Sequence, residues 1–237
     1  MFTAGFRRIA RGREGELCVR SVIFDLDGTL ADTSGDLLAA ANACFRDMGE
    51  GDLLGPGDEA IALRGGRSML NAGFKRLGRD EPETVDAWYP KLLEHYRGAI
   101  DAHTFFFDGA LDAVEELKTR GFGVGICTNK PEALVELLLG NLGARDDFGA
   151  LVGADTLPVR KPDPEPLFET IDRLGCDRTR SCLVGDSDTD RNTAKAAGLP
   201  SILVTFGPAG GDMPALQPEA LLHRYSDLPD LADQLIL

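Results

Sequence analysis

Two aspartates separated by one residue end an apolar run near the start of the chain. The stretch reads SVIFDLDGTLADT, residues 21–33, and the two aspartates are Asp25 and Asp27. The apolar run is typical of a buried parallel strand, and open parallel sheets bind ligands beyond the carboxyl ends of their strands. Two carboxylates at one strand end can supply a nucleophile and, two residues later, a proton donor. The stretch therefore predicts a catalytic strand end.

Further polar clusters follow later apolar runs. Residues 128–130 read TNK, Lys161 lies in VRKPDPEP, and GDSDTD at residues 185–190 contains Asp186 and Asp190. Each cluster comes at or shortly after the end of an expected strand, so one crevice can hold them all. Converging carboxylates raise one another's pKa, which makes a divalent cation with oxygen ligands the expected guest, and Mg²⁺ fits best. With Mg²⁺ and a lysine in place, the site would attract a phosphate group.

The elements that position these residues follow from apolar periodicity. Five runs are typical of buried parallel strands, at residues 21–25, 123–129, 150–155, 181–187 and 201–207. Helical patterns lie before, between or after the later runs, at residues 108–121, 130–143, 164–175 and 188–198. This alternation predicts an α/β fold with a Rossmann-like, doubly wound parallel sheet.

Residues 36–102 interrupt the alternation. They contain helical patterns but no convincing strand, which predicts an inserted all-helical cap that lies over the site as a lid. The α/β core then comprises residues 21–35 and 103–237, and residues 1–20 form an N-terminal extension. That extension is rich in arginine and lacks the apolar core of a secretory signal peptide, while an organelle transit peptide remains an open alternative.

Composition and charge limit the kinds of partner that the protein is expected to bind. The 237 residues include 39 acidic and 25 basic side chains, and the net charge of −14 argues against a nucleic-acid partner. No window reaches the roughly 18 to 20 apolar residues of a membrane helix, so no membrane partner is expected. Five cysteines without a C-x-x-C pair are interpreted as reduced thiols, which favours a cytoplasmic protein. A monomer and a homodimer both remain open.

An ordered set of motifs resembles a known family. DLDGTLADT, CTNKP, RKPDPEP and GDSDTDRNTAKAAG, with a helical insertion between the first two, are similar to the motifs of haloacid dehalogenase superfamily phosphatases. The resemblance runs from about residue 21 to the C-terminus and is strongest to the bacterial phosphoglycolate phosphatase group. It implies Mg²⁺-dependent hydrolysis of a small phosphate monoester through an aspartyl-phosphate. The expected substrate is 2-phosphoglycolate, which would give glycolate and phosphate.

The resemblance also implies catalytic roles. Asp25 would attack phosphorus, while Asp27 would protonate the leaving oxygen and later accept a proton from water. Thr128 and the backbone N–H of Asn129 would hold the phosphoryl oxygens, and Lys161 would neutralise charge. Thr29 is included among the expected phosphate-binding residues.

The same resemblance implies a metal site. Mg²⁺ would be bound by a carboxylate oxygen of Asp25, the backbone carbonyl of Asp27 and the carboxylate of Asp186. Asp190 completes the expected metal group, and it would orient a metal-bound water or Lys161.

The motifs constrain the identity of the substrate less than they constrain the type of reaction. A sugar phosphomutase of the β-phosphoglucomutase type uses the same pair of aspartates, and a phosphatase for another small phosphometabolite or nucleotide is a further alternative. The dehalogenase branch is disfavoured because Asp27 is present. In the cap, the Gly-rich stretch ALRGGRSML at residues 62–70 offers Arg67, and after it Arg64, as the group that binds a substrate carboxylate.

Overall fold

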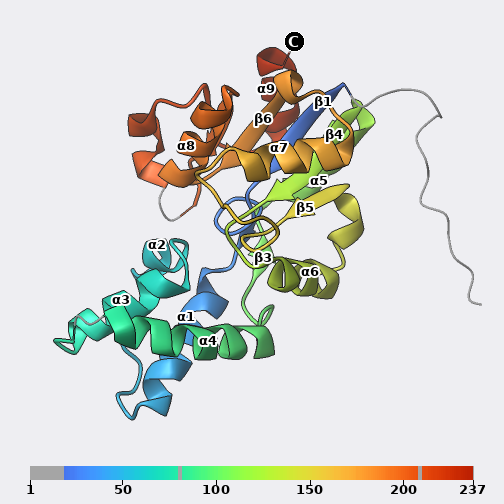
Figure 1. Ribbon diagram of the computed structural model, residues 1–237. Coiled ribbons are helices and arrows are strands. Elements are labelled where there is room, and N and C mark those ends of the chain that lie inside the picture. The colour runs from blue at the N-terminus through green and yellow to red at the C-terminus, as the bar shows by residue number, and fades with distance from the viewer. Residues whose placement is uncertain (1–18, 80–81, 208–209, 237) are drawn as a thin grey trace, which may run out of the picture.

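The protein has a central sheet of parallel strands (Figure 1). The computed structural model describes residues 19–79, 82–207 and 210–236. Six strands lie in the order β5-β4-β1-β6-β7-β8, and every neighbouring pair is parallel. The predicted doubly wound parallel sheet is confirmed. The strands are β1 (Arg20–Phe24), β4 (Phe122–Cys127), β5 (Ala150–Val152), β6 (Ser181–Gly185), β7 (Ser201–Val204) and β8 (Ala220–Leu222).

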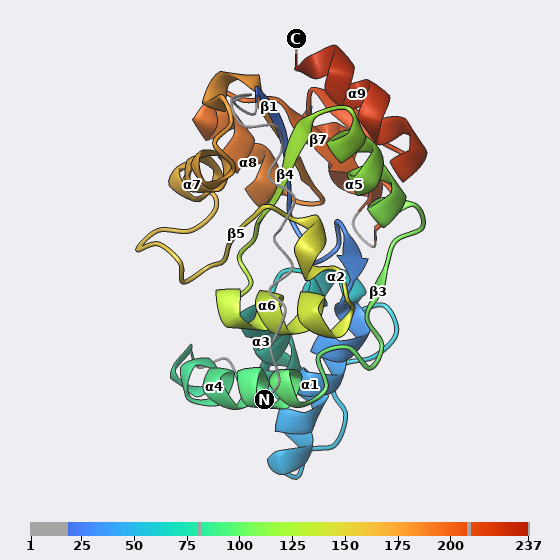
Figure 2. The same cartoon turned by 90° about the vertical axis from the view of Figure 1, so that its right-hand side faces the viewer.

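Helices cover both faces of this sheet. Figure 2 shows α7 and α8 on one side of the strands and α5 and α9 on the other. The helices of this part are α5 (Ala110–Thr119), α6 (Glu132–Asn141), α7 (Glu165–Leu174), α8 (Asp188–Ala197) and α9 (Leu228–Leu235). Short 3-10 helices span Arg145–Asp147, Arg178–Arg180, Gly210–Leu216 and Tyr225–Asp227.

Strand β1 shows why its sequence is an unbroken apolar run. Val22 and Phe24 belong to the larger core cluster, whereas Ile23 belongs to the cluster beneath α7 and α8. All three side chains are fully buried. Successive side chains of a strand point to opposite faces, so a strand covered on both faces must be apolar throughout.

A separate group of helices lies beyond the carboxyl ends of the strands (Figure 1). We call α1 to α4 the helical unit; its members are α1 (Ser34–Asp47), α2 (Glu59–Ala62), α3 (Gly66–Arg76) and α4 (Pro82–Gly98). Residues 36–102, apart from 80–81 outside the described ranges, contain no strand.

Two chain crossings join the helical unit to the core. Strand β2 (Ala31–Asp32) leads into α1 and pairs antiparallel with β3 (Phe105–Phe106), which leads back. Buried Asp36, in the first turn of α1, accepts hydrogen bonds from the N–H of His103 at 2.9 Å and the hydroxyl of Thr104 at 2.7 Å. The outgoing and returning segments are therefore fastened to each other.

The structure differs from the sequence prediction in short elements. The five predicted strands are all present, but each ends one to three residues earlier because its last predicted residues turn toward the loops. Strands β2, β3 and β8 were missed, since two or three residues carry no measurable periodicity. The predicted extension at residues 1–20 lies outside the described residues up to residue 18.

One cysteine differs from the prediction of reduced thiols. Cys44, Cys127 and Cys182 are buried free thiols, as predicted. Cys176 is instead disulfide-bonded, so the prediction of a reduced thiol is wrong there. Among the described helices, none has the length and apolar character needed to cross a membrane.

Candidate active site

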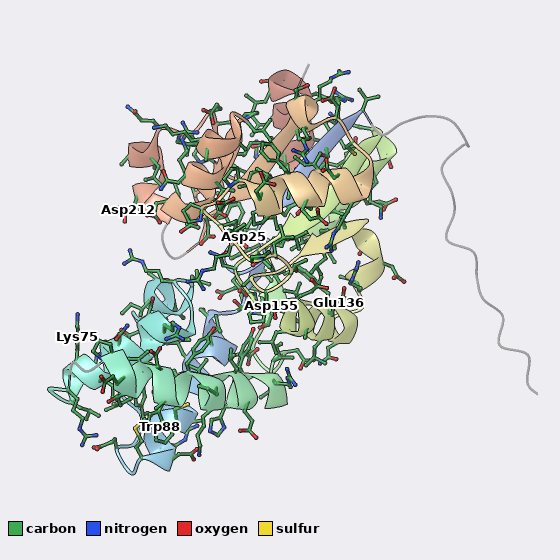
Figure 3. The ribbon with its side chains drawn as sticks, in the orientation of Figure 1. Asp25, Lys75, Trp88, Glu136, Asp155 and Asp212 are labelled. Carbon is green, nitrogen blue, oxygen red and sulfur yellow. The ribbon has the colours of Figure 1, made fainter. Side chains whose placement is uncertain are left out.

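The ends of three neighbouring strands carry the predicted site residues. Asp25 directly follows β1, Thr128 directly follows β4 and Asp186 directly follows β6. The chain proceeds from β1 to β4 and β5 on one side and resumes with β6 on the other, so the strand order reverses beside β1. Ligands bind at such a reversal because the connections diverge and leave a crevice. Figure 3 shows Asp25 at the end of the sheet that faces the helical unit.

Asp25 is fixed through its backbone and its carboxylate. Its N–H donates to the carbonyl of Val184 at 2.9 Å, which extends the β1–β6 pairing by one residue. Its Oδ1 accepts a 2.7 Å hydrogen bond from the N–H of Leu26, and its Oδ2 lies 3.1 Å from Nζ of Lys161. The Thr128 side chain lowers the pKa of the same carboxyl group. A carboxylate held in this way can attack a ligand with little loss of conformational entropy.

Asp25, Asp186 and Asp190 form an acidic cluster. One carboxylate oxygen of each lies within 4.8 Å of the others. Burial raises the pKa of Asp25 to about 6, although Lys161 opposes this shift. Burial, and then the charge of Asp190, raises the pKa of Asp186 well above its ordinary value. The protein therefore supplies less positive charge than these carboxylates need, and their oxygen donors fit a hard cation such as Mg²⁺.

Lys161 is the buried cation of this cluster. Its Nζ lies 2.7 Å from Asp190 and 3.1 Å from Asp25. Burial by itself would lower the pKa of Lys161, but the two carboxylates raise it above its ordinary value, so the ammonium stays charged. Asp190 also accepts hydrogen bonds from the hydroxyl of Ser187 at 2.6 Å and the N–H of Asp186 at 3.3 Å. Asp190 thus orients Lys161 and the turn after β6 together.

The D-G-T part of the first motif packs against Asp186. Gly28 has φ of +80°, and a Cβ there would lie 2.3 Å from a carboxylate oxygen of Asp186, so only glycine fits. The fully buried Thr29 donates its hydroxyl to the other oxygen of Asp186 at 3.1 Å. Because this hydroxyl is used on Asp186 and Thr29 does not line the cavity described below, its geometry favours orientation of Asp186 over the predicted contact with phosphate.

Asp27 has a different environment from Asp25. Its Oδ1 accepts a 2.7 Å hydrogen bond from the hydroxyl of Thr33 and another of 2.7 Å from Nζ of Lys130. Lys130 also donates to the hydroxyl of Tyr96, on α4, at 2.6 Å. The carboxylate of Asp27 is therefore bound to a lysine that contacts both the core and the helical unit.

The turn after β4 brings two motifs together. Thr128 accepts a 3.3 Å hydrogen bond from the N–H of Lys130, which shapes the turn. The side-chain amide of Asn129 donates to the carbonyl of Lys161 at 3.0 Å. Residues predicted from the separate sequences CTNKP and RKPDPEP thus meet at one place.

A cavity of about 830 Å³ opens between the core and the helical unit. The core contributes Asp25, Asp27, Asp186 and residues 128–131 to its wall. The helical unit contributes residues 62–67 and part of one face of α4. The predicted catalytic aspartates and the predicted specificity segment therefore line the same cavity.

The two arginines proposed for substrate recognition differ in their contacts. The guanidinium of Arg67 is paired with Asp86 and lies 4.5 Å from the centre of the Tyr89 ring. Arg64 is exposed on the cavity wall and forms no ion pair with the described residues. Arg67 must leave Asp86, or share it, to bind a substrate.

The sequence prediction missed Lys130, Thr33 and Tyr96 as parts of the site. Lys130 carried a usable signal, because it lies in TNK directly after a predicted strand. Thr33 belongs to the motif DLDGTLADT, six residues after Asp27, but was given no role there. Tyr96 carried no signal, since its contact with Lys130 depends on how the helical unit docks.

The family follows from comparison with known proteins. Residues 22–204 match the family model of the haloacid dehalogenase-like hydrolases. The chain belongs to this family. Its curated relatives include the phosphoglycolate phosphatase of Xanthomonas campestris, which is 37% identical over 193 residues, 81% of this chain and 86% of the relative. The enzyme of the same name from Agrobacterium fabrum is 34% identical over 90% of this chain and 93% of its own. This member of the family is therefore a phosphatase.

Solved structures support the same fold. A predicted phosphoglycolate phosphatase from Haemophilus somnus superposes with a TM-score of 0.76 at 22% identity, covering 92% of this chain and 99% of its own. CbbY from Rhodobacter sphaeroides, solved in complex with phosphate, gives a TM-score of 0.72 at 24% identity, covering 89% and 96%. Identities this low carry the fold alone.

Proposed function

We propose that this phosphatase hydrolyses 2-phosphoglycolate to glycolate and phosphate through an aspartyl-phosphate on Asp25. The observation that carries the proposal is the meeting of Asp25, Asp186 and Lys161 at the strand reversal, on the wall of one cavity. The substrate rests on the curated relatives, which bear the name phosphoglycolate phosphatase and align over most of this chain.

The acidic cluster is proposed to hold Mg²⁺. Its ligands would be the carboxylates of Asp25 and Asp186 and the backbone carbonyl of Asp27. When bound, Mg²⁺ would neutralise the carboxylates and the charge of the phosphoryl group. Asp190 remains beside this site, where it is hydrogen-bonded to the turn after β6 and ion-paired with Lys161.

In the first step, a carboxylate oxygen of Asp25 forms a bond to phosphorus as the bond from phosphorus to the substrate oxygen breaks. Asp27 donates a proton to that leaving oxygen, which departs as the hydroxyl of glycolate. Thr128 and the N–H of Asn129 hold the phosphoryl oxygens, while Lys161 neutralises their charge.

In the second step, water attacks phosphorus and the bond to Asp25 breaks. Asp27, now ionised, accepts a proton from this water, so the proton balance closes over the two steps. Phosphate then leaves, and both aspartates return to their initial states.

We further propose that residues 36–102, which contain most of the helical unit, are a cap that encloses the substrate over the core of residues 21–35 and 103–237. A cavity of about 830 Å³ lies in the range that holds drug-sized ligands, which is far more than phosphoglycolate fills. Closure of the cap would reduce this space, exclude water and bring Arg67 or Arg64 to the substrate carboxylate.

The experiment is a rate comparison with purified protein. Phosphate release with Mg²⁺ is measured for phosphoglycolate, p-nitrophenyl phosphate, sugar phosphates and nucleoside monophosphates, and the substrates are ranked by kcat/KM. We expect phosphoglycolate to rank first and Asp25→Asn to be inactive on all substrates. A higher rank for a sugar phosphate or nucleotide would overturn the substrate assignment. Isomerisation of β-glucose 1-phosphate would identify a mutase instead.

A further inference from the structure

Lys130 is a buried cation between two units of the protein. Its side chain is 4% exposed, and its Nζ lies 2.7 Å from Oδ1 of Asp27. The same Nζ donates to the hydroxyl of Tyr96 at 2.6 Å and lies 4.4 Å from the centre of that ring. Tyr96 is 1% exposed and belongs to α4. One ammonium group therefore contacts a core carboxylate and a residue of the helical unit.

The contacts of the Lys130 ammonium group fix its position. A buried ammonium must find hydrogen-bond acceptors, and Lys130 finds them in the Asp27 carboxylate and the Tyr96 hydroxyl. The contact between an ammonium and an aromatic face adds a second restraint. Lys130 cannot move away from Asp27 without losing this acceptor.

The two hydrogen bonds to Asp27 end on the same oxygen. Lys130 and Thr33 both donate to Oδ1, each at 2.7 Å. Oδ1 is therefore saturated by protein donors, and the plane of the carboxylate is set by two groups on different segments. Proton transfer to a ligand would then fall to Oδ2, whose direction follows from the fixed Oδ1.

We propose that Lys130 is a positioning residue that aims Oδ2 of Asp27 at the leaving oxygen, and that Tyr96 holds Lys130 in place from the helical unit. The inference rests on the proposed function, because it takes Asp27 as the proton donor. Its consequence is that the seating of α4 controls the alignment of Asp27. The helical unit then affects proton transfer as well as substrate recognition.

The test separates a step that needs a proton donor from one that does not. Release of the leaving group is measured in single turnover by rapid quench, with phosphoglycolate and with p-nitrophenyl phosphate, whose leaving group departs without protonation. Lys130→Met is expected to slow release from phosphoglycolate roughly 10- to 100-fold, below the range of about 10² to 10⁴ for complete loss of a proton donor. Release of p-nitrophenol should change less than about threefold. Lys130→Arg, which keeps the charge and a donor, should recover much of the loss.

Tyr96→Phe tests the contact from the helical unit, with Tyr89→Phe as its matched control. Both tyrosines lie on α4 and line the cavity, but only Tyr96 contacts Lys130. Tyr96→Phe is expected to slow release from phosphoglycolate about three- to tenfold, in line with the loss of one ordinary hydrogen bond. Tyr89→Phe should affect the two substrates alike, because it keeps the hydrogen bond between Tyr96 and Lys130. Thermal melts of all variants identify any loss of fold.

Asp27→Asn in the same assay separates the proton-donor role of Asp27 from the positioning role of Lys130. If Asp27→Asn slows both substrates equally, Asp27 is not the proton donor and the proposed mechanism fails. If Asp27→Asn is selective for phosphoglycolate while folded Lys130→Met is not, the positioning role alone is overturned. The double variant Lys130→Met with Asp27→Asn should be no slower than Asp27→Asn, because a positioning residue has nothing left to position. Additive losses would mean a separate, structural role.

Discussion

Two buried lysines contact the two aspartates of the DLD sequence, and their surroundings differ. Lys161 contacts Asp25 inside the α/β core, where its other ion-pair partner is also a core carboxylate. Lys130 contacts Asp27 in the core and Tyr96 in the helical unit. The first cluster lies within one unit, whereas the second also includes a hydroxyl group from the helical unit. The contacts of Asp25 thus lie within the core, and the contacts of Asp27 reach the helical unit through Lys130.

The sharpest way to test the core cluster is to remove the proposed nucleophile. Asp25→Asn should reduce kcat by at least about 10⁴-fold with every substrate, because an amide oxygen is a poor nucleophile and a weaker metal ligand. Its fold should persist, since the carboxylate of Asp25 has a raised pKa and so contributes no stability at neutral pH. Rapid quench with ³²P-labelled substrate measures the phosphoenzyme. A normal turnover rate in this variant would rule out the covalent route.

Removing each lysine compares the two clusters through stability. Lys161→Met leaves Asp25 and the fully buried Asp190 without their cation, and breaking such a buried pair costs about 3 to 5 kcal/mol. Lys130→Met leaves one carboxylate, on Asp27, whose side chain is 18% exposed, so the expected loss is smaller, about 1 to 3 kcal/mol.

Urea unfolding without Mg²⁺ measures both losses, with Lys91→Met as the surface control, because Lys91 is exposed on α4. Equal losses for the two buried lysines would show that the clusters do not differ in the way the contacts indicate. The comparison is made in the same buffer, since added cations would change the first cluster more than the second.

The acidic cluster also predicts how Mg²⁺ changes stability with pH. The pKa of Asp25 is about 6 in the folded protein, above its ordinary value of 3.8, so the folded state holds this proton more tightly than the unfolded state. Without Mg²⁺, stability therefore falls as pH rises from about 4 through 6. Mg²⁺ binds the ionised form, so its stabilisation should be largest above pH 7 and should fade below about pH 6.

Thermal melts with and without Mg²⁺ measure this effect. At 100 times its dissociation constant, a ligand that binds only the folded state stabilises it by about 2.7 kcal/mol. Asp186→Asn should abolish the Mg²⁺-dependent shift, while Asp188→Asn, in the neighbouring helix α8 and outside the acidic cluster, should retain it. A shift that does not depend on Asp186 would place the cation elsewhere.

The contrast between the clusters explains what sequence could predict. Asp25, Thr128 and Asp186 each follow an apolar run, and the reversal of strand order brings such ends together, so their meeting is a consequence of fold class. Lys161 lies a few residues beyond its strand, so its place near the site followed from the strand end, and its role followed from the family motif. The meeting of Asp25, Thr128 and Asp186 was predictable, because the carboxyl ends of parallel strands lie at the same edge of a sheet.

No comparable rule predicts that Lys130 contacts both Asp27 and Tyr96. Tyr96 is one of several buried residues on α4, and no local pattern indicates that its hydroxyl meets Lys130 from a strand end 34 residues away. The direction of the Thr29 hydroxyl could not be predicted either, because it could turn toward phosphate or Asp186; in the structure it donates to Asp186. Docking between units and side-chain direction are set by tertiary packing, which one sequence does not display.

The smallest expected effect concerns Arg67, on the side of the cavity formed by the helical unit. A hydrogen bond from Arg67 to the carboxylate of phosphoglycolate is worth roughly 1.5 to 3 kcal/mol. Arg67 must first give up its exposed pair with Asp86, which costs about 0.2 to 1 kcal/mol. Arg67→Ala should therefore lower kcat/KM for phosphoglycolate by a factor that corresponds to about 1 to 2 kcal/mol of lost transition-state stabilisation. The kcat/KM for p-nitrophenyl phosphate, which has no carboxylate, should be unchanged.

Asp86→Ala sharpens this prediction, because it removes the competitor without touching the guanidinium. It should raise kcat/KM for phosphoglycolate by up to about fivefold, which is the worth of one exposed ion pair. Arg64→Ala is the matched variant, since Arg64 lines the same cavity and has no ion pair among the described residues. A loss with Arg64→Ala and none with Arg67→Ala would assign the carboxylate to Arg64. Equal losses on both substrates would mean that these arginines support the cap and not the recognition of a carboxylate.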